Sequence, residues 1–212
     1  MQDQNNTGPI YGSPEPDSKS SQKREILSTL AIIIIAPLVA LFLTAFVFQS
    51  YEVDGPSMEK TLFNKDRLLV NKTSRTWARI TGHDYQPKRY DVIIFNHTEN
   101  YGLDGVTDKQ LIKRVIGLPG DRVVVKDGVV RVYNQENPNG FLVDQKGPEA
   151  AVIGETIATS EIDQTVNESE VFVMGDNRPN SLDSRAFGPI ELNDIVGKLS
   201  VRIYPFNEIT RF

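Results

Sequence analysis

The chain has 212 residues, of which 39% are hydrophobic and 24% charged, and its formal net charge is −5. This length suits one globular domain with attached segments, and the acidic balance argues against broad nucleic-acid binding, so we expect no nucleic-acid partner. Because the chain contains no cysteine, disulfides, thiolate nucleophiles and cysteine-ligated metals are excluded.

The N-terminal part of the chain combines a polar tail with a long apolar stretch. Residues 1–25 are polar and rich in Pro, Gly, Ser, Asn and Gln, which predicts a disordered tail. From Ile26 to Phe48 the chain has no charge, and as a helix this stretch would span about 35 Å, enough for a hydrocarbon core of ~30 Å. A cleaved signal peptide has a shorter apolar region. We therefore expect a transmembrane helix over residues 26–48.

The charges that flank this stretch indicate its orientation. Lys23 and Arg24 precede it, and the next basic residue after it is Lys60. Positive charge collects on the cytoplasmic side of membrane helices. We therefore expect a single-pass protein of the plasma membrane, or of a thylakoid membrane, with a cytoplasmic N-terminus and residues 49–212 on the extracytoplasmic side.

Residues 49–212 carry repeated strand signals, namely short Val- and Ile-rich segments bounded by turn residues. Asp127-Gly128 suits a tight type I′ hairpin turn, and no long amphipathic helix follows residue 50. The pattern predicts a mainly β catalytic domain, a β-sandwich or barrel-like fold, with an insertion at about residues 134–169. The expected strands lie within residues 66–72, 90–96, 110–117, 121–133, 170–176 and 195–206.

A candidate nucleophile follows the apolar stretch closely. Ser57 lies in "GPSMEKTL", nine residues after Phe48, so it can be at most about 30 Å from the end of the stretch and close to membrane lipid. A serine attacks well only when a base removes its proton. A lysine can be that base if its pKa falls from ~10.4 to roughly 7–8, which costs about 4 kcal/mol against the ammonium form.

Lys60 is one candidate base. Ser57-x-x-Lys60 matches the S-x-x-K motif of β-lactamases and penicillin-binding proteins. However, Lys60 adjoins Glu59, which favours the charged lysine. The expected partner motifs are also missing, because the nearest strings, "KTS" at 72–74 and "GDN" at 175–177, occur in the reverse order. An acyl-serine enzyme of this type is the alternative reading.

Lys113 is the other candidate base. In "QLIKRVIGLPG" the alternation of a strand places Leu111, Lys113 and Val115 on one face. A lysine between apolar neighbours on a buried strand can lose its charge through desolvation. From composition alone, a lysine that extends its ammonium into water from an edge strand remains open.

Three segments in order resemble the type I signal peptidase family, also called leader peptidase. Residues 55–62 are similar to its nucleophile box, residues 113–121 to its lysine box, and "GDNRPNSLDSRAFG" at 175–188 to its C-terminal box. The resemblance implies a membrane-bound serine endopeptidase that removes signal peptides from exported preproteins. It also implies small substrate residues at positions −1 and −3 relative to the cleaved bond.

The resemblance assigns roles position by position. Ser57 would be the nucleophile and Lys113 the general base, and Ser181 would donate a hydrogen bond to the lysine amine or accept one from it. The backbone N–H of Ser57 would form the oxyanion hole, but Gly55 lacks the hydroxyl that some members place there. The chain also has Lys60 where the first box usually has proline. The remaining implied residues are Asp183, Arg185 and Asp176 as supports of the dyad, and Met58, Leu69 and Phe95 as the lining of the substrate pockets.

This mechanism needs no histidine, metal or other cofactor. The chain has two histidines, His83 and His97, without an HExxH motif, and both lie in polar segments that predict surface turns. Two other classes compete with the peptidase. A self-cleaving repressor protease would be soluble, which the stretch at 26–48 opposes, and a non-catalytic membrane-anchored β-domain that binds a partner would leave Ser57 unreactive.

Overall fold

The structure is a computed structural model, and it describes residues 18–82, 85–100, 106–143 and 161–212. The chain divides into two compact units, residues 1–42 and 43–212. His83 and most of the predicted tail lie outside the described residues.

The first unit is built on one long helix. Helix α1 (Ser18–Phe42) is followed by a π-helical segment, η1 (Leu43–Val47), which already belongs to the second unit. The stretch Arg24–Val47 is long and apolar enough to cross a membrane. It begins two residues before the predicted span of 26–48, and α1 itself begins at Ser18, inside the segment predicted to be a disordered tail. It ends one residue earlier than predicted, because Phe48 pairs with β2 and is the first residue of β1.

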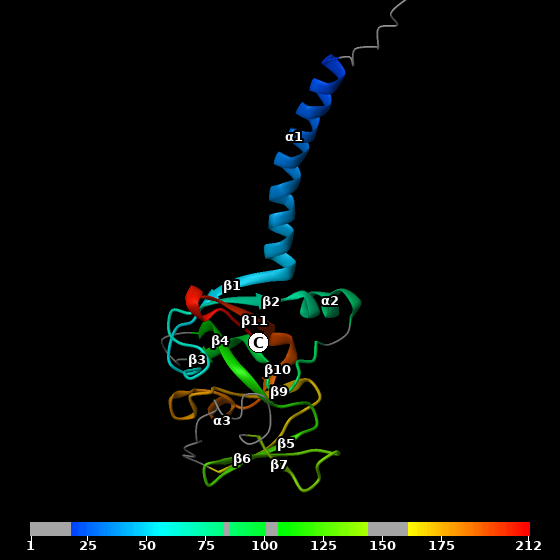
Figure 1. Cartoon of the computed structure of the whole chain (residues 1–212). Helices are drawn as coiled ribbons and strands as arrows, with labels where there is room; N and C mark the ends of the chain where they lie inside the picture. The colour runs from blue at the N-terminus through cyan, green and yellow to red at the C-terminus, as the bar shows by residue number, and fades with distance from the viewer. Residues whose placement is uncertain (1–17, 83–84, 101–105, 144–160) are drawn as a thin grey trace, which may run out of the picture. The chain divides into compact units, whose positions relative to one another are not determined.

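A large antiparallel sheet forms most of the second unit (Figure 1). Its strands are β1 (Phe48–Glu52), β2 (Arg67–Asn71), β3 (Val92–Asn100), β4 (Val106–Gly117), β9 (Glu170–Met174), β10 (Ile190–Glu191), β11 (Ile195–Tyr204) and β12 (Thr210–Arg211). Their order is β1-β2-β11-β3-β4-β9-β10, with β12 beside β11. Among the described strands β1 and β10 do not pair, so this sheet is open and is not a closed barrel.

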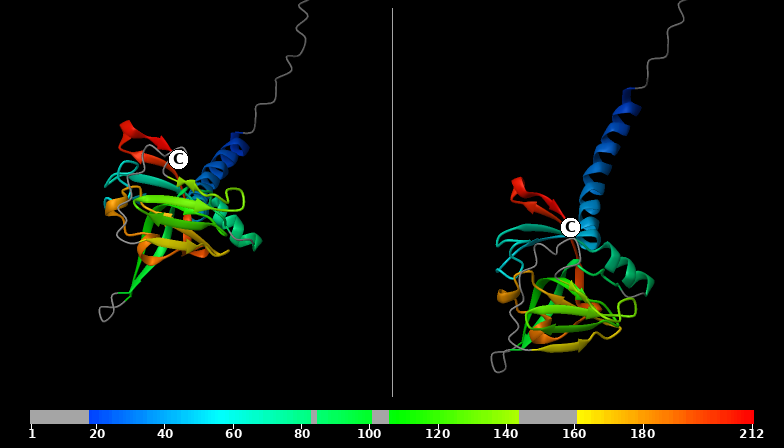
Figure 2. Two further views of the ribbon diagram at one scale, coloured as in Figure 1. Left: turned by 90° about the horizontal axis from the view of Figure 1, so that it is seen from below. Right: turned by 60° about the horizontal axis from the view of Figure 1, so that its bottom comes forward.

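A smaller sheet is visible beside the large one in Figure 2. It contains β5 (Arg122–Lys126), β6 (Val129–Tyr133), β7 (Phe141–Leu142) and β8 (Ile162–Thr165) in the order β7-β6-β5-β8. Asp127 and Gly128 both have positive φ, +50° and +76°, which confirms the predicted hairpin turn. The described ends of the predicted insertion supply β7 and β8, while residues 144–160 lie outside the described part.

Short helices complete the second unit. They are α2 (Thr73–Thr81), η4 (Arg178–Asn180), α3 (Ser184–Phe187), η5 (Leu192–Asp194) and η6 (Phe206–Glu208). Of these, α2 has nine residues and is an element that the sequence did not predict.

The hydrophobic core joins the two sheets. Ile116, Phe172 and Met174 of the large sheet pack against four valines of the small sheet, and all seven side chains are buried; the valines are Val123, Val125, Val130 and Val132. A second cluster around Phe95 and Ile195 fills the space near β10. The predicted mainly β fold is confirmed, and its framework fixes the two segments that carry Ser57 and Lys113.

Candidate active site

Ser57 lies in a turn between β1 and β2. Gly55 begins this turn with φ of +98°, a conformation that glycine adopts without strain. Met58 and Leu62 are fully buried, and the N–H of Leu62 donates to the carbonyl of Met58 at 2.8 Å. Two side chains of the turn, Met58 and Leu62, are therefore packed in the hydrophobic core, while Ser57 stays half-buried at the surface.

Asn177 fastens the same turn from the other side. Its backbone N–H donates to the Ser57 carbonyl at 3.0 Å, and its side-chain amide donates to the Pro56 carbonyl and to the Glu59 carboxylate, both at 3.0 Å. The prediction from sequence did not include Asn177. The signal that could have indicated it is its position in the "GDN" string at 175–177, within the segment that resembles the C-terminal box.

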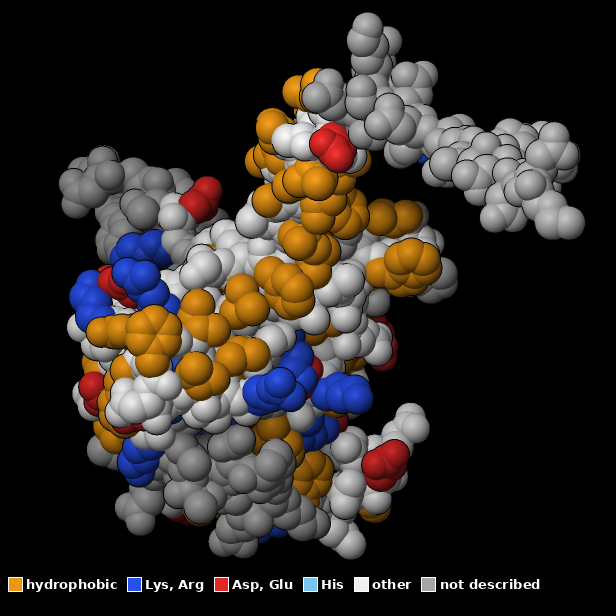
Figure 3. Space-filling model, turned by 45° about the horizontal axis from the view of Figure 1, so that its top comes forward, with side chains coloured by type: hydrophobic (Ala, Val, Ile, Leu, Met, Phe, Trp, Pro, Cys, Tyr) orange, Lys and Arg blue, Asp and Glu red, His pale blue; other side chains and the backbone are white. Residues whose placement is uncertain are grey.

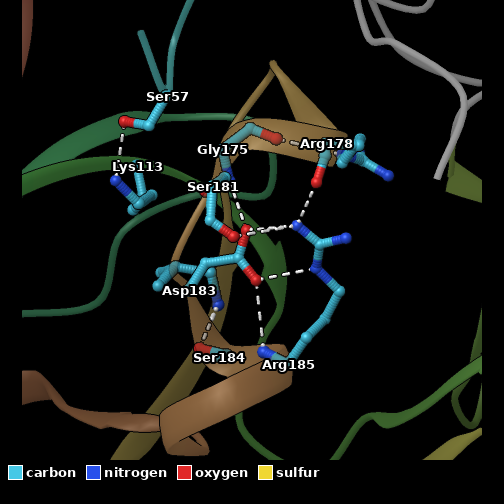
Figure 4. Close-up of polar contacts among 9 residues, drawn as sticks. Ser57, Lys113, Gly175, Arg178, Ser181, Asp183, Ser184 and Arg185 are labelled. Atoms are coloured by element: carbon cyan, nitrogen blue, oxygen red, sulfur yellow. Dashed lines mark hydrogen bonds and ion pairs between the residues drawn. The ribbon is translucent and has the colours of Figure 1, made fainter. Parts of the chain in front are cut away.

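Lys113 reaches Ser57 from β4. Its Nζ lies 2.8 Å from Ser57 Oγ (Figure 4). It also donates a hydrogen bond to the Ile112 carbonyl at 3.0 Å. The side chain is 3% exposed. Desolvation by this burial lowers the pKa of Lys113 to about 8, although the charges of Asp183 and Asp176 act in the opposite direction. The neutral amine, which is the form that can act as a base, therefore becomes the main form above about pH 8.

Asp183 organises the loop next to the dyad. It is fully buried, caps α3 by accepting from the Arg185 N–H, and accepts from the Gly175 N–H at 3.0 Å. The Arg185 guanidinium donates to it at 2.8 Å and also donates to the Arg178 carbonyl at 2.7 Å (Figure 4). The three segments that carry Gly175, Arg178 and Asp183 are therefore held together.

Ser181 does not make the hydrogen bond that the resemblance implies. Its Oγ is buried and, within the described residues, has no hydrogen-bond partner, while Lys113 Nζ donates to Ile112 instead. A Cβ at Gly175 would lie 2.2 Å from Ser181 Oγ and 2.5 Å from the Ser57 carbonyl oxygen. Glycine at position 175 is therefore required for Ser57 and Ser181 to approach each other so closely.

A buried ion pair supports the opposite side of the turn. Arg114, 2% exposed, donates to the two carboxylate oxygens of Asp176 at 2.8 and 2.6 Å. The Thr61 hydroxyl donates to the same carboxylate. Asp176 thereby links β4, which carries Lys113, to the turn that carries Ser57.

A small pocket of about 120 Å³ opens beside the dyad. Its lining residues are Tyr51, Glu52, Asp54, Ser57, Leu68, Ile94, Gln110, Leu111, Ile112 and Lys113. The small volume and the apolar lining residues Leu68, Ile94, Leu111 and Ile112 suit a small apolar side chain.

The three predicted pocket residues do not line this pocket. Met58 and Phe95 are fully buried in core clusters, and Leu69 is half-buried and is not among the residues that line the pocket. Their neighbours Leu68 and Ile94 take the expected places. Leu69 and Phe95 each follow one of these residues directly in its strand, and adjacent residues of a strand point to opposite faces of the sheet.

The other titratable candidates lie outside the dyad. Lys60 is exposed and has φ of +81°. His97 is part of β3 and stacks on Phe187 with ring centroids 4.3 Å apart, so the prediction that it lies in a turn was wrong. Among the described residues, no group of three or more His, Cys, Asp or Glu side chains could hold a metal ion.

A buried lysine in contact with a serine, beside an apolar pocket on a β framework, is the arrangement of a serine hydrolase with a lysine base. Comparison with known proteins gives the particular family. The sequence model described as "Signal peptidase, peptidase S26" matches residues 26–204. The chain belongs to this family of serine endopeptidases.

Two relatives from Bacillus agree with this assignment, and one solved structure also shows similarity to this chain. A signal peptidase I of Bacillus licheniformis is 33% identical over 92% of this chain and 97% of its own length. A signal peptidase I of Bacillus caldolyticus is 36% identical over 82% of this chain and 89% of its own. A crystal structure of a signal peptidase I from Enterococcus faecalis is 29% identical and covers 54% of this chain and 97% of its own, with a TM-score of 0.34.

Proposed function

We propose that this protein removes signal peptides from exported preproteins by way of an acyl-enzyme on Ser57. The observation that carries the proposal is the 2.8 Å contact between Ser57 Oγ and the buried amine of Lys113. Family membership and the pocket of about 120 Å³ beside this contact support the same conclusion.

In the first half of the reaction, Ser57 Oγ attacks the carbonyl carbon of the peptide bond while its proton moves to neutral Lys113 Nζ. The backbone N–H of Ser57 stabilises the negative oxygen that develops on the carbonyl. The lysine then gives this proton to the nitrogen of the leaving amine, the C–N bond breaks, and the acyl group remains on Ser57 as an ester.

In the second half, Lys113 accepts a proton from a water molecule as the water attacks the ester carbonyl. The proton passes to Ser57 Oγ when the C–O bond breaks, which releases the carboxylic acid and restores both residues. When the Ser57 hydroxyl donates a hydrogen bond to the lone pair of neutral Lys113 Nζ, the two N–H groups of the amine each need an acceptor. The first N–H donates to the Ile112 carbonyl. We assign the buried Ser181 Oγ as the acceptor of the second.

The same scheme assigns the supporting residues. Asp183 and Arg185 hold the loop of Ser181, and Asp176 with Arg114 holds the turn of Ser57. Gly55 offers no side-chain donor to the oxyanion, and its φ of +98° disfavours a serine there. The oxyanion therefore relies on backbone donors of this turn.

The substrate and location follow from the pocket and the apolar helix. The small pocket favours small residues at positions −1 and −3 of the preprotein. Lys23 and Arg24 before the apolar stretch favour a cytoplasmic N-terminus, which puts Ser57 on the extracytoplasmic side of the plasma or thylakoid membrane.

The proposal is tested by cleavage of a labelled preprotein in detergent by the full chain. Ser57→Ala removes the nucleophile, so we expect no cleavage. Lys113→Ala removes the base, and we expect the rate to fall at least ~100-fold. Lys60→Ala is the matched control and should retain most activity. Normal cleavage by either dyad variant would refute the assignment, and loss of activity in the control alone would support the S-x-x-K alternative.

A further inference from the structure

Helix α2 exposes two large apolar side chains. Trp77 is 69% and Ile80 is 73% exposed, whereas Ala78 on the other side of the helix is buried. Because Trp77 and Ile80 are three residues apart, they form one apolar stripe on the surface of the helix. In the described structure, α2 buries only Ala78 and leaves Trp77 exposed, so nothing covers its apolar side.

A basic stripe runs beside the apolar one. Lys72, Arg75 and Arg79 are spaced by three and four residues, and all three line a pocket of about 410 Å³. None of the residues that line this pocket is acidic. Burial, and then the nearby Arg79, lower the pKa of Arg75, while Asp194 acts in the opposite direction. Figure 3 shows one face of the molecule, on which hydrophobic side chains and Lys and Arg side chains are both exposed.

Hydrogen bonds fix α2 to the last turn of the apolar stretch. The N–H of Lys72 donates to the Val47 carbonyl at 2.8 Å, and the Thr76 hydroxyl donates to the Phe46 carbonyl at 2.9 Å. Val47 is the final residue of the stretch that can cross a membrane. When that stretch is inserted, α2 must lie at the depth where hydrocarbon gives way to lipid headgroups.

We propose that α2 is an interfacial helix that docks the catalytic unit on an anionic lipid surface. Trp77 and Ile80 enter the boundary between headgroups and acyl chains, and the pocket of Lys72, Arg75 and Arg79 receives the phosphate of an acidic phospholipid. Tryptophan prefers this boundary, and basic side chains on an amphipathic helix bind anionic lipids. The inference depends on membrane insertion of the chain and not on its peptidase activity.

Trp77 reports directly on this contact because it is the only tryptophan in the chain. The full chain is reconstituted in vesicles of phosphatidylcholine, with and without phosphatidylglycerol, and its fluorescence is quenched either by brominated phospholipid or by aqueous acrylamide. We expect a blue-shifted emission, quenching by the brominated lipid that increases with phosphatidylglycerol, and protection from acrylamide.

Two pairs of variants separate the apolar and the basic contributions. Arg79→Gln should shift the balance between lipid-bound and free helix about fivefold toward the free state in phosphatidylglycerol vesicles. Ile80→Ser should reduce quenching by brominated lipid in both kinds of vesicle. The controls Lys126→Gln and Val129→Ser change exposed residues of β5 and β6 in the small sheet and should have no effect.

Two results would overturn the proposal. Free access of acrylamide to Trp77 in vesicles, without quenching by brominated lipid, would show that α2 does not touch the bilayer. Equal quenching with and without phosphatidylglycerol, unchanged in Arg79→Gln, would refute the anionic headgroup site. Neither measurement requires catalysis, so failure here is distinguishable from failure of the proposed function.

Discussion

At the scale of single residues, the central question is how a lysine close to two carboxylates loses its charge. Asp183 and Asp176 both favour the ammonium form of Lys113, yet burial outweighs them and lowers its pKa to about 8. Each carboxylate is already paired with a guanidinium, Asp183 with Arg185 and Asp176 with Arg114. These arginines offset the field of the carboxylates at the amine, so desolvation decides the charge.

The buried amine should reduce the stability of the folded protein. Between about pH 8 and 10.5 the unfolded chain binds a proton at Lys113 that the folded chain does not, so the free energy of unfolding rises with pH in this window. Below about pH 8 the buried amine of the folded protein is charged, and its desolvation lowers the free energy of unfolding by about 3 kcal/mol.

Lys113→Met should therefore be inactive but more stable than the wild type below about pH 8, by up to about 3 kcal/mol. Its advantage should shrink as the pH rises toward 10. Denaturant unfolding of the full chain in detergent across this pH range measures the difference. The exposed Lys60→Met is the control and should show no such pH dependence. A Lys113→Met variant that is no more stable at any pH would show that the buried amine has no such cost.

The catalytic pair was easier to predict from the sequence than the residues that line the pocket. Ser57 and Lys113 stand in distinctive motifs, and the structure brings them into contact. Phe95 was expected at the pocket, which Ile94 lines instead, because Val92–Phe95 is buried on both faces of the sheet. Such a segment shows no alternation of polar and apolar residues, so nothing in it indicates which side faces the site.

At the scale of elements, the nucleophile turn contains an unusual backbone conformation. Lys60 has a φ of +81°, a backbone conformation that is strained for residues other than glycine. The first box of the family usually has proline here, and proline holds φ near about −65°. The turn of this chain is therefore built differently around Thr61 and Leu62, which are both buried.

Lys60→Gly should stabilise the protein by about 0.5–1 kcal/mol because the strain is relieved, while part of the gain is lost to the greater freedom of the unfolded chain. Lys60→Pro should destabilise it and lower the rate of preprotein cleavage, because Ser57 lies in the same turn. Thermal unfolding and cleavage assays of both variants measure these effects. A proline variant as stable and active as the wild type would contradict this conformation of the turn.

The strands were easier to predict than the short elements that join them. The six predicted strand regions coincide with β2, β3, β4, β5 with β6, β9 and β11, although β3 continues beyond its predicted end at 96 and β4 begins before its predicted start at 110. Strand β1 was missed because Phe48 continues the apolar run of the helix without a break. Helix α2 was missed because nine residues give few turns in which periodicity can be recognised.

At the scale of the whole molecule, the apolar stretch determines where the chemistry occurs. It ends at Val47, and β1 begins at the next residue and leads directly into the turn of Ser57. A cleavage site that has just emerged from a membrane is within reach of such a nucleophile. The sequence predicts the direction of insertion only through the two basic residues at 23 and 24.

Orientation can be measured in membrane vesicles of known sidedness. A protease added to the outside of inverted vesicles should remove the N-terminal tail and leave residues 49–212 protected, because we expect the tail on the cytoplasmic face. Right-side-out vesicles should give the opposite result. Exchange of Lys23 and Arg24 for glutamine should weaken the preference. A protected tail in inverted vesicles would reverse the proposed localisation.

The most direct test of the account is the pH dependence of kcat/KM for cleavage of a preprotein by the full chain. A neutral Lys113 as the base predicts a rate that rises about tenfold per pH unit and levels off near pH 8, with the same midpoint in the Lys60→Met variant. A profile that is flat through this range, or whose midpoint moves when Lys60 is replaced, would contradict the assignment of Lys113 as the base that activates Ser57.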